Sequence, residues 1–321
     1  MPGLTQTSAT FQHITVTELH PTFGAEVSGV DFSRPVEDDV FQEILAAINK
    51  YGVCVFRKTG LDDARHVAFA GQFGELDDVS PYMAGGRAHR LSDVRLFDVS
   101  NVDLDGTIFA LDNKRREWNK GNGLFHVDSS FNPRRAGYSL LRAEELPPAG
   151  MGGETEFADV RTAFDELPAE EQAELKAQNY IAAHSLWHSR KTAAPETFAD
   201  LNPEDYPMSR HRLVQRHEPS GRDTLYLAAH IHHIEGLDSD ESANLFNRLF
   251  THATQPRYVL RVAWEGAGDL VLWDNTSVMH RAVGGRFEGK YKRDMRRATV
   301  HDSSAAAWGL NEHSNVRQGL P

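Results

Sequence analysis

The chain has 321 residues, of which 40% are hydrophobic and 25% charged, and its formal net charge is −12. This length and composition fit one large globular domain, which we expect over residues 1–321, with a core at about 15–302 and a polar tail at 303–321. The acidic balance argues against nucleic acid or a membrane surface as a partner, because phosphate binding needs clustered cations. No apolar stretch is long enough for a membrane helix.

The first residues, MPGLTQTSATFQH, have neither the basic start nor the apolar centre of a secretory signal. The single cysteine, Cys54, lies in the apolar run 52-GVCVF-56, which favours a buried thiol over a disulfide. Both features lead us to expect a cytoplasmic protein. Whether it forms a homo-oligomer stays open at this point.

Three segments carry apolar residues at helical spacing. The first covers 37–52, begins with acidic residues and has Gly52 as a stop signal. A short one follows Asp159 and ends at Pro168, and another covers about Ser239–Ala253. Their apolar stripes indicate helices that pack on a core.

Short runs of strand-forming residues lie between these helices, separated by Gly, Pro, Asn and Asp. The runs cover 52–56, 138–144, 179–185, 224–229, 257–264, 269–274 and 296–301. The pattern predicts a fold that is mainly β with flanking helices, and a closed double sheet of the jelly-roll type fits it. The segment 187–210 has little periodicity, so we expect a surface excursion or an active-site lid there.

The stretch 124-LFHVDSSF-131 places a histidine and an acid two positions apart. In a strand, residues two apart point to the same face, so His126 and Asp128 can reach one metal ion while Val127 packs the other way. An H-x-D triplet by itself is more often a surface or hydrogen-bonded pair. A metal site therefore needs a distant third ligand.

The run 269-DLVLWDNTSVMHRAV-283 supplies the best third ligand. It has an apolar strand, a turn, and a second strand in which Val278 and His280 share one face. A histidine on the face of a core valine points inward, where an imidazole without a partner would be unfavourable. The alternative is a core histidine that hydrogen-bonds to the backbone.

The stretch 293-RDMRRATV-300 is the third notable feature. If it is extended, Arg293, Met295 and Arg297 share one face and Arg296 lies on the other. Two inward guanidinium groups indicate two carboxylates to be held, because arginine pairs with carboxylates through two parallel hydrogen bonds. The competing interpretation is a set of exposed arginines on an edge strand.

Two histidines and one carboxylate occupy one face of an octahedron and leave three positions open, an arrangement typical of non-haem Fe(II) oxygenases. Zinc would favour a tetrahedral set with at most one open position. From the residues alone, two other functions remain open: a non-redox hydrolase or isomerase that uses zinc or manganese, and a ligand-binding barrel without catalysis.

Ordered motifs from about Thr15 to Asp302 resemble the TauD/TfdA family of Fe(II)- and 2-oxoglutarate-dependent dioxygenases. The motifs are 24-GAEVSGVDFSRP-35, 71-GQFGELDD-78, 98-DVSNVDLDG-106, 124-LFHVDSSF-131, 138-YSLLRAEELPPAG-150, 152-GGETEFADVRTAFDELP-168, 229-AHIHHIEGL-237, 271-VLWDN-275 and 293-RDMRRATV-300. The resemblance implies a double-stranded β-helix (jelly-roll, cupin-like) core, with Fe(II), 2-oxoglutarate and O2 as cofactor and cosubstrates.

The same resemblance implies roles for individual residues. His126, Asp128 and His280 match the iron ligands, while Thr155 and Arg293 match the pair that holds the distal carboxylate of 2-oxoglutarate.

Arg297 matches the arginine that holds the acidic group of the primary substrate, and we expect Asn122 to bind the substrate as well. The implied reaction oxidises a C–H bond of a small carboxylic acid, by hydroxylation or ether cleavage, and releases succinate and CO2. An amino acid or sulfonate substrate, with desaturation or cyclisation, is the alternative.

Overall fold

The structure is a computed structural model that describes residues 11–83, 88–110, 113–314 and 317. Residues 1–10, where we expect no secretory signal, lie outside the described residues. Positions 315–316 and 318–321 of the predicted tail lie outside them as well.

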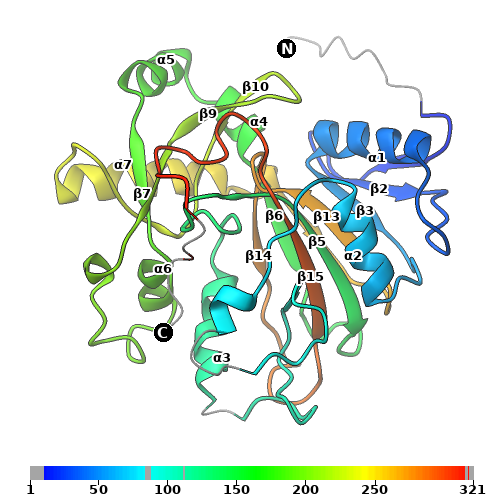
Figure 1. Ribbon diagram of the computed structural model, residues 1–321. Helices are drawn as coiled ribbons and strands as arrows, with labels where there is room; N and C mark the ends of the chain where they lie inside the picture. Colours follow the sequence, from blue (N-terminus) through cyan, green and yellow to red (C-terminus); the bar gives the residue numbers. More distant parts are fainter. Residues whose placement is uncertain (1–10, 84–87, 111–112, 315–316, 318–321) are drawn as a thin grey trace.

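Strands in the described part of the chain form four sheets (Figure 1). The largest sheet contains, in spatial order, β1 (Thr15–Glu18), β2 (Ala25–Ser28), β3 (Val53–Phe56), β13 (Leu270–Asp274), β5 (Ala136–Glu145), β15 (Asp294–His301) and β4 (Leu96–Asp98). The second contains β12 (Val259–Val262), β6 (Thr155–Asp159) and β14 (Val278–Ala282). The two others contain β11 (Ile231–Ile234), β7 (Ile181–His184) and β8 (Ser209–Arg212), and the pair β10 (Arg222–Leu225) and β9 (Val214–His217).

Helices lie around these sheets, so the expected class, mainly sheet with flanking helices, is confirmed. The α-helices are α1 (Asp38–Tyr51), α2 (Asp63–Gly71), α3 (Lys114–Asn119), α4 (Val160–Asp165), α5 (Ala169–Gln178), α6 (Leu186–Ala193) and α7 (Ser239–Ala253). Short 3-10 helices are η1 (Ser80–Met83), η2 (Lys120–Gly123), η3 (Pro203–Asp205) and η4 (Pro256–Tyr258).

The predicted helix at 37–52 is α1, which lies with α2 along the seven-stranded sheet (Figure 1). Its side chains Ile44 and Ile48 are fully buried in a cluster with strand residues such as Leu272. Gly52 ends the helix with φ of 71°, a left-handed conformation that glycine adopts without steric cost.

The face of the large sheet toward β12, β6 and β14 forms a second part of the core. Val55 and Trp273 of the large sheet share a buried cluster with Phe157 of β6 and Val278 of β14. The two sheets therefore pack face to face. Their apolar contact holds β14, which carries His280, next to β13 and β5.

The segment 187–210 is more regular than predicted. It contains most of α6, all of η3 and the start of β8. Aromatic packing accounts for the order, because the ring of Trp187 lies 4.6 Å from that of Tyr206 and 5.3 Å from that of Trp118. The segment is mostly polar, so its sequence pattern did not predict these aromatic contacts or the regular structure that they stabilise.

Cys54 is a free, fully buried residue on β3, as expected. Burial raises the pKa of its thiol. Among the described residues, no helix is long and apolar enough to cross a membrane.

Candidate active site

Three buried side chains meet where the chain passes His280 of β14. The ligand atoms of His126, Asp128 and His280 lie within 4.8 Å of one another, the one such group of metal-binding residues among those described. His126 and His280 face each other in an isolated β-bridge, with backbone hydrogen bonds of 3.0 and 2.8 Å in the two directions. The chain then turns at Asp128 and at Ser129, which has φ of 56°. The expected strand through 126–128 is thus a single bridge followed by a turn.

The two imidazoles present the form that binds metal. Nδ1 of His126 lies 2.7 Å from the carbonyl oxygen of Leu124, so this nitrogen donates and Nε2 keeps its lone pair. Nδ1 of His280 is buried and has no hydrogen-bond partner among the described residues. Burial lowers the pKa of both histidines, which keeps them neutral.

Asp128 is held from three sides. The hydroxyl of Ser139 on β5 donates to Oδ2 over 2.7 Å, and Nη1 of Arg297 donates to Oδ1 over 2.5 Å. Its backbone N–H donates to the side-chain oxygen of Asn275 over 2.9 Å. Burial favours a raised pKa for Asp128, but the charge of Arg297 and the hydrogen bond from Ser139 bring that pKa below its ordinary value. The carboxylate is therefore ionised and fixed in orientation.

Arg293 lies just before β15 and is buried. Its Nε donates to the carbonyl oxygen of Gly153 over 2.9 Å, and its backbone N–H donates to the side chain of Asn101 over 2.7 Å. Among the described residues no carboxylate forms an ion pair with it, and burial lowers the pKa of its guanidinium to about 10, although Glu154 opposes this. An anion bound here would replace the missing counter-charge.

Thr155 begins β6, two residues after the glycine that accepts from Arg293. Its Oγ1 accepts a hydrogen bond from the indole of Trp264 over 3.3 Å, which leaves the hydroxyl proton available to a ligand. Thr155 of β6 and Arg293, just before β15, are connected through Gly153, which accepts from Arg293 two residues before Thr155.

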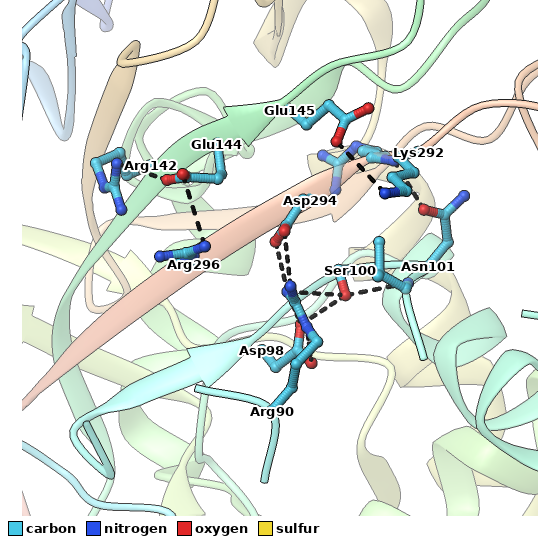
Figure 2. A network of polar contacts seen from close by, with 12 residues as sticks. Arg90, Asp98, Ser100, Asn101, Arg142, Glu144, Glu145, Lys292, Asp294 and Arg296 are labelled. Atoms are coloured by element: carbon cyan, nitrogen blue, oxygen red, sulfur yellow. Dashed lines mark hydrogen bonds and ion pairs between the residues drawn. The ribbon is translucent and has the colours of Figure 1, made fainter. Parts of the chain in front are cut away.

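Figure 2 shows the polar network that fixes the start of β15 next to Arg293. Arg90 donates to Asp98 of β4 over 2.9 and 3.1 Å and to Asp294 of β15 over 2.5 and 2.8 Å. Ser100 donates to Asp98 over 2.6 Å, and Asn101, the next residue, contacts Arg293. The network therefore connects the arginine at the site to both strands.

A cavity of about 300 Å³ opens beside Arg293. Its walls are mostly apolar, with Ile108, Phe109 and Phe287 among them, and Asn122 of η2 also lines it. A space of this size and composition accommodates a small organic molecule with an acidic group.

Residues 15–299 match the family described as "Taurine catabolism dioxygenase TauD, TfdA family". This chain belongs to that family. Among curated relatives, the alpha-ketoglutarate-dependent 2,4-dichlorophenoxyacetate dioxygenase of Cupriavidus pinatubonensis is 37% identical over 286 residues, which cover 89% of this chain and 97% of the relative. The (S)-phenoxypropionate/alpha-ketoglutarate-dioxygenase of Sphingobium herbicidovorans is 31% identical over 84% of this chain and 88% of its own length.

Among solved structures, a crystal structure of AAD-2 in complex with Mn(II) and N-oxalylglycine has a TM-score of 0.83 and 36% identity. The match covers 91% of this chain and 99% of AAD-2. The TauD/TfdA family expected from the motifs is thereby confirmed, and with it the enzyme class, a dioxygenase. The relatives named above are dioxygenases, which favours this class over the non-redox hydrolase and the catalytically inert barrel.

From sequence, an exposed position of Arg297 on an edge strand was the competing interpretation. In this TauD/TfdA protein β15 lies between β5 and β4, and the side chain of Arg297 is 16% exposed. Arg297 pairs with Asp128 and stacks over Phe97 at 5.0 Å. It therefore lies beside the metal ligands, on the face that the alternation predicted.

Sequence reasoning gave no role to Ser139 and Asn275. The amide of Asn275 donates to the hydroxyl of Ser139 over 3.0 Å, and both residues bind Asp128. Asn275 is part of the family motif 271-VLWDN-275, so the motif could have indicated it. Ser139 lies in an apolar strand without a signal of its own.

Proposed function

We propose that this protein is an Fe(II)- and 2-oxoglutarate-dependent dioxygenase that oxidises a C–H bond of a small carboxylic acid and releases succinate and CO2. The observation that carries the proposal is a set of two histidines and one carboxylate, together with a buried arginine, Arg293, that lines a cavity and has no acidic partner among the described residues. The family supports the same conclusion.

His126, Asp128 and His280 would hold the iron. The donor set fits Fe(II), because two neutral imidazoles and one ionised carboxylate on one face leave positions for a chelating cosubstrate and O2. With 2-oxoglutarate and O2 the metal supplies the oxidising power of the reaction. Ser139 and Arg297 orient the carboxylate of Asp128, so the protein sets the geometry of the site through these partners.

Arg293 and Thr155 would hold the distal carboxylate of 2-oxoglutarate. The guanidinium is already oriented by Gly153, so little side-chain entropy is lost when the anion binds. The hydroxyl of Thr155 has a proton to donate, which matches a carboxylate acceptor.

Arg297 and Asn122 would bind the primary substrate. Arg297 uses Nη1 on Asp128 and Nε on Thr299, so its Nη2 can bind the acidic group of a substrate near the metal. Apolar walls that include Phe109 and Phe287 would exclude water and pack on an apolar or aromatic substrate body. Relatives named for 2,4-dichlorophenoxyacetate and phenoxypropionate make an aryloxyalkanoic acid the first class to test.

The finer features of the fold belong to this proposal as well. We place the two facing sheets in a double-stranded β-helix, or jelly roll, and residues 1–321 in a single dioxygenase domain that acts in the cytoplasm. The support is the packing of β13 and β5 against β6 and β14 and the length of the family match.

The test is anaerobic addition of Fe(II) and 2-oxoglutarate to the protein, followed by visible absorption. Chelation of the metal by 2-oxoglutarate should give a weak charge-transfer band. Admission of O2 with a panel of small carboxylic acids should then release succinate in step with one or more of the acids. Absence of both the band and succinate would refute the proposed function.

A further inference from the structure

Arg190, on α6, is partly buried and carries a charge that no acid in the described part of the chain neutralises. Its one hydrogen bond to the described residues is a long contact of 3.5 Å from Nη1 to the side-chain oxygen of Asn122. Its Nε is buried without a partner, and its guanidinium lies 5.6 Å from the ring centre of Trp118. Such a group is unfavourable in a folded protein unless an anion binds to it.

The backbone beside Arg190 is shaped to admit its guanidinium. Gly121 of η2 has no side chain, and a Cβ at that position would lie 1.7 Å from Nη1 of Arg190. The neighbouring residues Asn122 and Gly123 line the cavity next to Arg293. The charged end of Arg190 therefore packs on the segment that forms the cavity wall and leads into His126.

The charges around Arg190 are positive. Burial and the nearby charge of Arg297 lower the pKa of Arg190 to about 10. Asp128 is the acid at this point, and Arg297 already binds it. Arg190 therefore has no acidic partner among the described residues near the metal ligands.

We propose that Arg190 is a substrate-binding residue that holds, together with Arg297, the carboxylate of an aryloxyalkanoate-type substrate. The inference rests on the proposed function, because it places the anion beside the metal ligands. Arg293 remains the partner of 2-oxoglutarate. Two guanidinium groups that approach one carboxylate from different elements, α6 and β15, would fix both its position and its direction.

The test compares wild-type protein with Arg190→Met, which keeps the length of the side chain without the charge, and with Arg190→Lys. Binding of phenoxyacetate and of its neutral isostere phenoxyacetamide is measured by calorimetry on the anaerobic complex with Fe(II) and 2-oxoglutarate. Arg190→Met should weaken phenoxyacetate binding by roughly 10-fold or more, while Arg190→Lys loses less. The affinity for phenoxyacetamide and the KM for 2-oxoglutarate should stay at their wild-type values.

Gly121→Ala gives a second route to the same result. The added methyl group would displace the guanidinium of Arg190 without removing it, so phenoxyacetate binding should fall while phenoxyacetamide binding is retained. This variant keeps the inference testable if Arg190→Met does not fold.

Three results would overturn the inference. They are equal phenoxyacetate affinity in wild type and Arg190→Met, no phenoxyacetate binding by the wild type, and an effect of Arg190→Met on the KM for 2-oxoglutarate alone. A charge-transfer band in the wild type separates these outcomes from failure of the proposed function, since the band depends on the metal and 2-oxoglutarate and not on the acid.

Discussion

Arg297 of β15 donates a hydrogen bond of 2.5 Å to Asp128, the carboxylate of the candidate metal site. One side chain thus joins the large sheet to the metal ligands, and we propose that it also binds the substrate. An effect of Arg297 on metal binding and an effect on substrate binding are therefore both expected, and they can be measured separately.

Arg297→Ala should lower the affinity for Fe(II) by roughly 10–100-fold, the usual effect of losing a group that orients a metal ligand. It should also slow substrate oxidation more than it weakens 2-oxoglutarate binding. Metal titration and turnover of an acid against its methyl ester measure the two effects. Arg296→Met is the matched control, because Arg296 pairs with Asp63 on the other face of the strand. Equal turnover of acid and ester in the wild type would remove Arg297 from substrate binding.

Replacing His126, Asp128 or His280 with Ala should abolish turnover, because three ligands give both affinity and geometry. Circular dichroism should show that each variant is folded. Full activity of any of the three, without excess iron, would show that the residue is not a ligand.

Arg293→Ala should raise the KM for 2-oxoglutarate by about 30-fold or more, because loss of a charged partner for a buried anion typically costs about 2–5 kcal/mol. Steady-state kinetics with varied 2-oxoglutarate measure the change. An unchanged KM would mean that another group binds the distal carboxylate.

Arg90→Met should destabilise the fold, because Arg90 joins Asp98 and Asp294 where their side chains are 4% and 9% exposed. Removing one partner of a buried pair typically lowers the free energy of unfolding by about 3–5 kcal/mol. Denaturant unfolding measures this loss. Arg95→Met provides the control, since the side chain of Arg95 is 52% exposed and its pair with Asp93 should contribute less than about 1 kcal/mol. Similar losses in the two variants would contradict the importance of the network.

Protonation of His66 should make the stability depend on pH. Burial lowers the pKa of His66 from 6.5 to about 3, while Nε2 lies 3.1 Å from the carbonyl oxygen of Leu140. Below pH 6.5, His66 binds a proton in the unfolded chain but not in the folded protein. The free energy of unfolding therefore falls as the pH falls from about 6.5 toward about 3.

The slope of this contribution is about 1.4 kcal/mol per pH unit. Unfolding free energies measured across this window should therefore change less steeply in His66→Gln than in wild type. An identical slope in wild type and His66→Gln would show that His66 is not the group that resists protonation.

The alternation of side chains between the two faces of a strand predicted which residues would share a face. It placed Arg296 and Arg297 on opposite faces, and the structure has them paired with Asp63 on one side and Asp128 on the other. The helical stripes likewise located α1 and α7 to within a residue or two. The spacing of apolar residues is enough for these predictions because it shows which face of a helix or strand is buried.

The sequence by itself determined the family, the mixture of sheet and helix, and which histidines and acid would form a candidate metal site. The tertiary structure decided which groups surround that site. Ser139 and Asn275 reach Asp128 from β5 and from the end of β13, and Arg190 reaches the cavity wall from α6. A periodic pattern says whether a side chain points inward, but the packing of sheets and helices decides what it meets there. Segments far apart in the chain therefore acquire neighbours that no local pattern encodes.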